Sequence, residues 1–366
     1  MENSNHQIGH REILTLLIIM MSGKVFLSFP RDMALLADSA GWLLVLLSGL
    51  FSLAGFTIIY ALICRFPEDN LLQITRKIAG NAVGTILGLV FFFYFLTNTF
   101  LLVRQFAESF ILMILPRTPI SVITLFFMAL LIYGTFLGIE TISRVAWFFG
   151  PYLLLAMVII IFSAAPTHLE MLLPLFGKGI GPVLKSAVIH IASFSEILFI
   201  PLIAPLIRKK DRIFKIGIWS ISIATLILAG MTAVIIITFN YNSASHLSFP
   251  VFQLARLIHI GEFIHRVESV FVFLWFLTAG IEMSALFYGT VISFTETFRI
   301  NNYRPLVFPL ATLVFTLSLL PQSMSETVHW DDFKISKYYS AIWIGIPFLL
   351  WLIALTLNKK AGKTDA

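Results

Sequence analysis

Repeated apolar segments, each about long enough to cross a lipid bilayer, dominate this sequence. A helix of about 20 residues spans a hydrocarbon core of about 30 Å, and ten such segments follow one another along the 366 residues. Their approximate limits are 13–29, 41–64, 83–115, 120–137, 145–165, 182–207, 213–239, 267–294, 306–320 and 339–357. We therefore predict a single transmembrane domain over residues 1–366: an all-α polytopic membrane protein with about ten helices.

The distribution of charge agrees with lipid as the solvent. Only 12% of the residues are charged and 58% are apolar, whereas about a quarter of a soluble domain is charged. Fifteen of the 25 lysines and arginines fall on the side that holds the N-terminus, eight fall on the other side, and two lie within segments. Because such residues prefer cytoplasmic loops and the number of crossings is even, we expect both termini to be cytoplasmic. The net charge of +6 then reflects orientation, and no nucleic-acid partner is expected.

Signatures of enzymes are absent from the sequence. It contains no HExxH, no nucleophile elbow and no cluster of histidine and cysteine with ligand spacing. The single cysteine, Cys64, excludes an internal disulfide and a multi-cysteine metal site. We expect no enzymatic activity, no metal and no cofactor.

Two segments carry polar residues where a membrane helix is expected to be apolar. Residues 22–24 (Ser-Gly-Lys) interrupt the first segment, and Pro30 is expected to end it. Residues 193–196 (Ser-Phe-Ser-Glu) interrupt the sixth segment and are followed by Pro201 and Pro205. Polar groups at this depth need a cavity or a partner. The first and sixth segments correspond if the ten spans form two inverted sets of five, so we predict a 5+5 inverted repeat with broken helices 1 and 6.

Broken helices predict a binding site near the bilayer midplane. The amide groups at the start of one half-helix attract a carboxylate, and the carbonyls at the end of the other attract an ammonium. Together they are suited to an amino-acid zwitterion. The ligand-binding candidates come from the two breaks and from two polar pairs on the third and eighth segments: Ser22, Gly23, Lys24, Val25, Tyr94, Asn98, Ser193, Ser195, Glu196, Ser284 and Tyr288.

Two readings stay open for several uncharged candidates. Tyr94 and Asn98 are four residues apart, as are Ser284 and Tyr288, so each pair shares a helix face. Each pair either lines the cavity or joins helices by hydrogen bonds. His190 either forms an interhelical hydrogen bond or relays a proton.

The charged residues within the segments have separate interpretations. Lys24 either takes the place of a bound sodium ion or extends to an aqueous vestibule. Glu196 and Glu282 are the candidates for proton coupling. Arg104 and Glu108, at positions i and i+4 near the outer end of the third segment, predict a structural ion pair.

The first break resembles a motif of the amino acid/polyamine permeases (APC superfamily). Residues 22–30 (Ser-Gly-Lys-Val-Phe-Leu-Ser-Phe-Pro), followed by Gly41, resemble the first broken helix of those transporters. Its usual pattern is Gly-x-Gly-Ile-Phe, then a proline and a glycine. Lys24 departs from the pattern because it stands beside the position of the second small residue. The resemblance implies the LeuT/APC fold.

A narrower resemblance covers nearly the whole chain. Residues 173–185 (Leu-Pro-Leu-Phe-Gly-Lys-Gly-Ile-Gly-Pro-Val-Leu-Lys) and 265–275 (His-Arg-Val-Glu-Ser-Val-Phe-Val-Phe-Leu-Trp), together with the ten-span layout, are similar to the B subunits of nutrient germinant receptors of endospore-forming bacteria. This resemblance implies a subunit of the spore inner membrane that binds a germinant, often an amino acid. It also implies partnership with a membrane-embedded A subunit and a C-subunit lipoprotein to trigger germination.

Two functions therefore compete. In the first, closure of the cavity around a nutrient shifts a conformational equilibrium that partner subunits detect. In the second, the chain is a proton-coupled secondary amino-acid transporter of the permease type.

Overall fold

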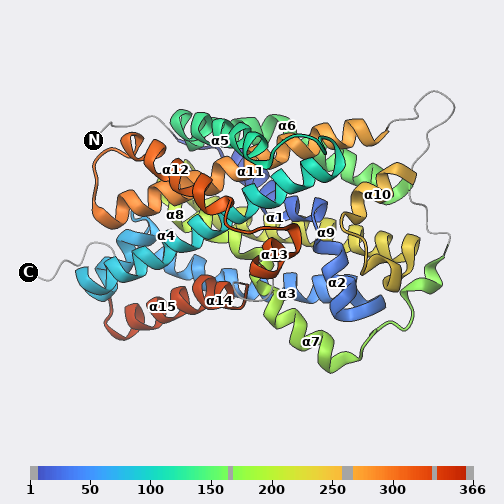
Figure 1. Ribbon diagram of the computed structural model, residues 1–366. Coiled ribbons are helices and arrows are strands. Elements are labelled where there is room, and N and C mark those ends of the chain that lie inside the picture. Colours follow the sequence, from blue (N-terminus) through green and yellow to red (C-terminus); the bar gives the residue numbers. More distant parts are fainter. Residues whose placement is uncertain (1–6, 164–167, 258–266, 332–335, 360–366) are drawn as a thin grey trace, which may run out of the picture.

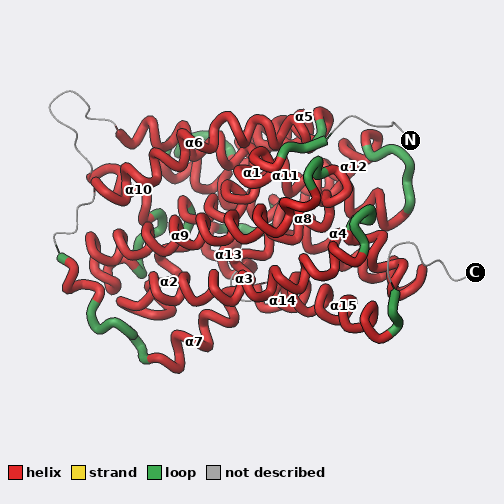
Figure 2. Tube along the Cα trace, turned by 180° about the vertical axis from the view of Figure 1, so that it is seen from behind, coloured by secondary structure: helices red, strands yellow, loops and turns green. Residues whose placement is uncertain are grey.

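The computed structural model describes residues 7–163, 168–257, 267–331 and 336–359 (Figure 1). These residues form helices and connecting loops with no β-strand among them (Figure 2). Eight helical segments of the described chain are long and apolar enough to cross a membrane. The two remaining predicted crossings are the shorter helix at the N-terminus with its break, and the helix that begins at Val307.

The helices are connected in chain order by short loops and by 3₁₀ or π segments. They are α1 (His10–Ser22), η1 (Gly23–Phe26), α2 (Phe29–Ala37), η2 (Asp38–Ala40), α3 (Gly41–Arg65), α4 (Leu71–Met113), α5 (Ile120–Leu137), α6 (Ile139–Ser163), η3 (Leu169–Leu172), α7 (Ile180–Ile189), η4 (His190–Leu198), α8 (Phe199–Ile203), η5 (Ala204–Leu206), η6 (Lys210–Arg212), α9 (Ile213–Ala244), α10 (Pro250–Leu257), α11 (Val267–Phe298), η7 (Arg304–Leu306), α12 (Val307–Ser318), α13 (Met324–His329), α14 (Ser336–Ser340), η9 (Ala341–Gly345) and α15 (Ile346–Thr356).

The first crossing is a broken helix, but its second half is longer than predicted. After α1 the chain forms the 3₁₀ segment η1, leaves helical geometry at Leu27 (φ −95°, ψ −140°), and begins α2 at Phe29. The prediction that Pro30 ends the segment is wrong, because Pro30 lies in the first turn of α2. A proline is tolerated there since the first amides of a helix have no intrahelical acceptor.

The sixth crossing is broken at the predicted polar residues. Helix α7 ends at Ile189, and the nine residues of η4 follow in 3₁₀ geometry before α8 begins. Phe194 departs from helical geometry within η4 (φ −116°, ψ 16°). Runs of 3₁₀ helix longer than about four residues are uncommon and often mark a hinge.

Two further helix ends differ from the predicted limits at kinks. Helix α4 begins at Leu71 and not at 83, with a kink at Gly80, whose φ of 82° suits glycine. Helix α9 continues to Ala244 past a kink at Asn240. The kinks separate the apolar spans from flanking turns of helix, which the apolar pattern alone does not reveal.

Helix α1 lies in the interior of the bundle. Its residues from Leu16 to Ser22 are all buried, and it packs against α6, α9 and η4. Peripheral helices instead expose large apolar side chains, such as Phe148 and Phe162 on α6, which are 62% and 76% exposed. Apolar exteriors of this kind match lipid and not water.

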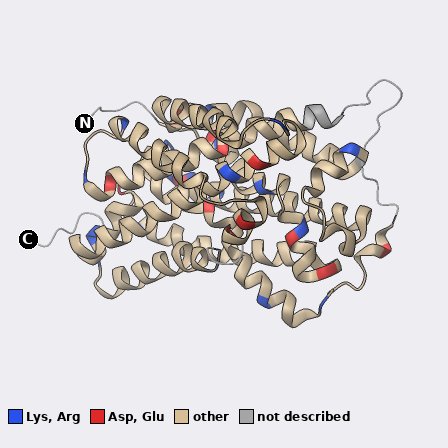
Figure 3. Cartoon of the chain, in the orientation of Figure 1, with Lys and Arg blue, Asp and Glu red and all other residues tan. Residues whose placement is uncertain are grey.

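Both ends of the chain leave the bundle at the same end, on the left in Figure 1. Near the N-terminus, the Ile8 amide donates to the Leu206 carbonyl at 2.9 Å, and the Arg208 amide donates to Ile8 at 3.1 Å. Near the C-terminus, Arg65 donates to the carbonyl of Lys359 at 3.3 Å. Charged residues gather at the ends of the helices and in a small group within the bundle (Figure 3).

Candidate functional site

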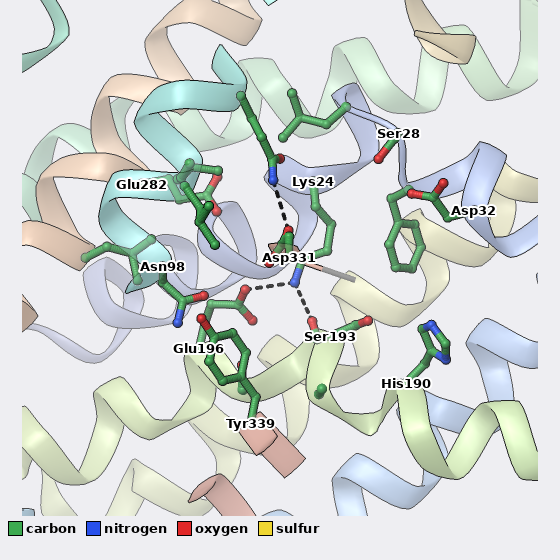
Figure 4. Close-up of a pocket in the computed structure, with 18 of the residues that line it drawn as sticks. Lys24, Ser28, Asp32, Asn98, His190, Ser193, Glu196, Glu282, Asp331 and Tyr339 are labelled. Atoms are coloured by element: carbon green, nitrogen blue, oxygen red, sulfur yellow. Dashed lines mark hydrogen bonds and ion pairs between the residues drawn. The ribbon is translucent and has the colours of Figure 1, made fainter. Parts of the chain in front are cut away.

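A small cavity lies between the two helix breaks (Figure 4). Its volume is about 110 Å³. Its walls come from Lys24 in η1, from the beginning of α2, from α4, η4 and α11, and from Asp331 and Tyr339 beyond α13. Because both breaks border it, their exposed backbone groups and polar side chains face one shared space.

Lys24 joins the first break to the second. Its Nζ donates to the carbonyl oxygen of Ser193 at 2.5 Å and to Oε1 of Glu196 at 2.8 Å (Figure 4). The Lys24 side chain is 19% exposed and that of Glu196 is 9% exposed. Lys24 therefore crosses the cavity to reach the break in helix 6, which is the geometry predicted for a cation that neutralises an exposed carbonyl, and not that of a lysine extending to an outer vestibule.

Carboxylates outnumber lysine and arginine among the described residues that line the cavity. Glu196, Glu282, Asp331 and Asp32 contribute carboxylates, and Lys24 is the one lysine. Asp32 is paired with its neighbour Arg31, which does not line the cavity. Asp331 accepts a hydrogen bond from the Gln105 amide at 3.0 Å.

Two carboxylate oxygens at this site have no hydrogen-bond partner in the described part of the chain. They are Oε2 of Glu196 and Oε2 of Glu282, and both are buried. Buried polar atoms without partners are rare and call for an explanation. A ligand that donates hydrogen bonds would satisfy both atoms.

Glu282 also explains the glycine at the first break. A Cβ on residue 23 would lie 2.0 Å from Oε2 of Glu282. Gly23 has helical dihedrals (φ −56°, ψ −33°) that any residue adopts. Glycine is needed here for the close approach of α11, and not for its backbone conformation.

The structure brings most of the predicted charged and polar residues together. Lys24, Asn98, Ser193, Ser195, Glu196 and Glu282 line the cavity. Tyr94 lies just behind it and donates a hydrogen bond to Oγ of Ser195 at 2.8 Å, and the Asn98 amide donates to the Tyr94 carbonyl at 2.8 Å. Among the residues of the first break, Ser22, Gly23 and Val25 are buried beside the cavity without lining it.

The predicted pair on α11 does not line this cavity. Ser284 donates to the carbonyl of Gly280 on its own helix at 2.6 Å and faces α5, where a Cβ on Gly134 would lie 2.9 Å from its Oγ. Tyr288 packs edge-on against Tyr303, with ring centroids 5.8 Å apart. Glu282, two residues before Ser284, points to another face of the helix because successive residues are about 100° apart. The pair is placed as the helix-packing alternative predicts.

Several residues at the site were not singled out from the sequence. Gln105 lies seven residues after Asn98 and so on the same face of α4, a spacing that the sequence does contain. Asp331 and Tyr339 follow α12 and reach the cavity only through the tertiary fold. The Tyr339 hydroxyl is buried and has no partner among the described residues, and its ring lies 4.9 Å from that of Tyr94.

The remaining predicted polar groups have structural contacts. The ion pair of Arg104 and Glu108 is confirmed, with 2.6 Å between Nε and Oε1, and both side chains are buried. His190 lines the cavity, and its Nδ1 lies 2.9 Å from the carbonyl oxygen of Ser186. No group of three or more His, Cys, Asp or Glu in residues 7–163, 168–257, 267–331 and 336–359 is arranged to hold a metal ion.

Solved structures of transporters share this architecture. Mhp1, a nucleobase-cation-symport-1 family transporter in a closed conformation with bromovinylhydantoin bound, has a TM-score of 0.66 and 12% identity, covering 98% of this chain and 95% of that one. MhsT in complex with L-phenylalanine has a TM-score of 0.69 and 16% identity, covering 97% and 92%. The protein is therefore a polytopic membrane protein of the LeuT/APC transporter fold.

Sequence comparison gives the family. Residues 7–327 match the family described as "Spore germination protein". Spore germination proteins B2 and KB of Bacillus subtilis (strain 168) are each 24% identical to this chain; the first alignment covers 99% of both proteins, and the second covers 98% of this chain and 97% of its relative. Spore germination protein A2 of the same organism is 26% identical, with 91% of each chain covered. This chain belongs to the spore germination protein family.

Proposed function

We propose that this protein is the membrane subunit of a nutrient germinant receptor that binds a small amino acid between its two broken helices. The observation that carries the proposal is the contact of Lys24 with Ser193 and Glu196, which couples the two breaks across a small polar cavity. A ligand that enters this cavity meets both breaks at once, so binding can change how they are held together.

The cavity suits a small zwitterion. Lys24 and the N-terminal turn of α2, which begins beside Ser28, offer positive partners for a carboxylate. Glu196, Glu282 and the Ser193 carbonyl offer partners for an ammonium. A volume of about 110 Å³ favours a small amino acid over a large one. MhsT, which has this fold, was solved with an amino acid.

In the proposed role, the ligand acts as a signal. Binding shifts an equilibrium between two conformations by as much as the ligand's affinity for them differs. The family resemblance suggests that an A-type membrane subunit and a C-type lipoprotein detect the change. We place the protein in the spore inner membrane with both termini in the cytoplasm, as the family and the distribution of lysine and arginine suggest.

A proton-coupled amino-acid transporter is the second candidate. The buried, unpartnered oxygens of Glu196 and Glu282 favour it, because such carboxyl groups mark proton pathways in membrane transporters.

Uptake in proteoliposomes separates the two functions. We would measure binding and accumulation of radiolabelled L-amino acids by the purified chain, with and without a pH gradient, and use protein-free liposomes as the control. Saturable binding without accumulation supports the receptor subunit. Accumulation driven by the gradient and lost in Glu196→Gln and Glu282→Gln supports the transporter. Absence of any amino-acid binding contradicts both.

A further inference from the structure

The ammonium of Lys24 already lies where the ammonium of an amino acid would be expected to bind. It contacts a carbonyl of the broken helix 6 and a buried carboxylate, at 2.5 and 2.8 Å. A terminal carbonyl and a carboxylate are the two acceptors that favour an alkylammonium group. Chemically, the head of Lys24 and the α-ammonium of an amino acid are the same kind of donor.

The remaining polar atoms of the site show what an incoming molecule must bring. Oε2 of Glu196 and Oε2 of Glu282 accept no hydrogen bond from the described residues, and Asp331 already receives one from Gln105. The cavity therefore has a surplus of anionic acceptors. Lys24 is the one lysine or arginine among its described lining residues, and it is occupied.

We propose that an amino acid binds by exchanging partners with the Lys24–Glu196 ion pair. The ligand's ammonium displaces Nζ of Lys24 from Ser193 and Glu196, and the displaced Nζ binds the ligand's carboxylate. One ion pair becomes two, and the net charge of the cavity does not change because the ligand is a zwitterion. This inference rests on the proposed amino-acid ligand and adds how that ligand is selected.

The exchange selects against ligands that carry one charge. An amine without a carboxylate would displace Lys24 and leave its ammonium without a partner in a largely buried cavity. A carboxylate without an ammonium would have to draw Lys24 away and leave Glu196 unpaired. Breaking a buried pair by removing one partner is strongly unfavourable, so both are expected to bind weakly.

The exchange also alters the connection between the two breaks. Without ligand, Lys24 ties η1 directly to η4. With an amino acid inserted, the same two segments are joined through the ligand, so their separation changes with occupancy. A change in separation at the two hinges is a signal that the rest of the bundle can transmit.

Three matched probes test the exchange in the full chain reconstituted in nanodiscs. They are L-alanine, ethylamine (alanine without its carboxylate) and propionate (alanine without its ammonium), measured by calorimetry. The key variant is Lys24→Met, which removes the tethered ammonium and keeps the length of the side chain. Lys185→Met is the control, because Lys185 lies exposed on α7 and outside the cavity.

The exchange predicts a switch of preference and not a general loss. Wild type and Lys185→Met should bind L-alanine and not the other probes. Lys24→Met should bind L-alanine at least about tenfold more weakly and ethylamine at least about tenfold more tightly, whereas Glu196→Gln should weaken both. Size-exclusion profiles matching wild type would show that the variants are folded.

Other outcomes overturn the inference in distinguishable ways. If Lys24→Met weakens L-alanine and ethylamine alike, or leaves L-alanine unchanged, the exchange is wrong and the amino-acid site stands. If sodium ions restore L-alanine binding to Lys24→Met with no gain for ethylamine, Lys24 is a fixed substitute for a cation. If wild type binds none of the twenty amino acids, the proposed function fails together with the exchange.

Discussion

Replacement of Gly23 by alanine tests the packing between the first break and α11. The new Cβ would lie 2.0 Å from Oε2 of Glu282 and 3.1 Å from its Cδ. Ordinary contact begins at 3.4 Å, so the carboxyl group must move by about 1.4 Å. Overpacking of this kind costs about 1–3 kcal/mol, and alanine recovers about 0.4–1 kcal/mol by restricting the unfolded chain. We expect a net loss of about 1–2 kcal/mol in the free energy of unfolding.

The assay is equilibrium unfolding of the purified protein in mixed micelles titrated with SDS. Gly181→Ala is the matched control, since no atom lies within 4 Å of its added Cβ, and it should be neutral or slightly stabilising. In a double-mutant cycle, Glu282→Ala should remove the penalty of Gly23→Ala, whereas Glu282→Gln, which keeps the shape of the side chain, should not.

The reasoning is refuted if Gly23→Ala stabilises the protein as Gly181→Ala does. It is also refuted if Glu282→Gln relieves the penalty as fully as Glu282→Ala, because the interaction would then be one of charge and not of contact.

Three further substitutions test the core and the cavity. Arg104→Met should lower the free energy of unfolding by about 3–5 kcal/mol because it leaves Glu108 charged, buried and unpaired, and adding Glu108→Leu should recover most of the loss in the same SDS titration. Tyr339→Phe should leave unfolding unchanged but weaken amino-acid binding about three- to tenfold, the value of one hydrogen bond; an unchanged binding isotherm would remove Tyr339 from the site. Gly217→Ala, whose Cβ would lie 2.0 Å from the Phe56 ring, should cost about 1–3 kcal/mol, and a cycle with Phe56→Leu that shows no coupling would contradict this contact.

The breaks in helices 1 and 6 could be predicted because their causes are local. Glycine, lysine, serine and glutamate are costly within a membrane helix, so Gly23, Lys24 and Glu196 mark the site in the sequence. The course of the chain after the first break could not be read from the apolar pattern. Pro30 is compatible with both the end and the beginning of a helix, and only the geometry after Leu27 decides between them.

The membership of the cavity was only partly predictable because it depends on how helices rotate about their axes. Ser284 and Glu282 are two residues apart, yet one faces α5 and the other faces the break at Gly23. Asp331 and Tyr339 come from segments more than 130 residues after η4 and reach the cavity through the tertiary fold. No local pattern in the sequence contains that information.

The geometry of η4 gives helix 6 the properties of a screw. A 3₁₀ helix rises about 2.0 Å per residue with about three residues per turn, and an α-helix rises about 1.5 Å with about 3.6. Conversion of the nine residues of η4 to α geometry would shorten the segment by about 4.5 Å and rotate one end against the other by about half a turn. The chain beyond α8 runs to Leu206, which holds the N-terminal segment at Ile8, so a rearrangement around Lys24 and Ser193 could be felt as a pull and a twist at the end of the molecule where both termini emerge.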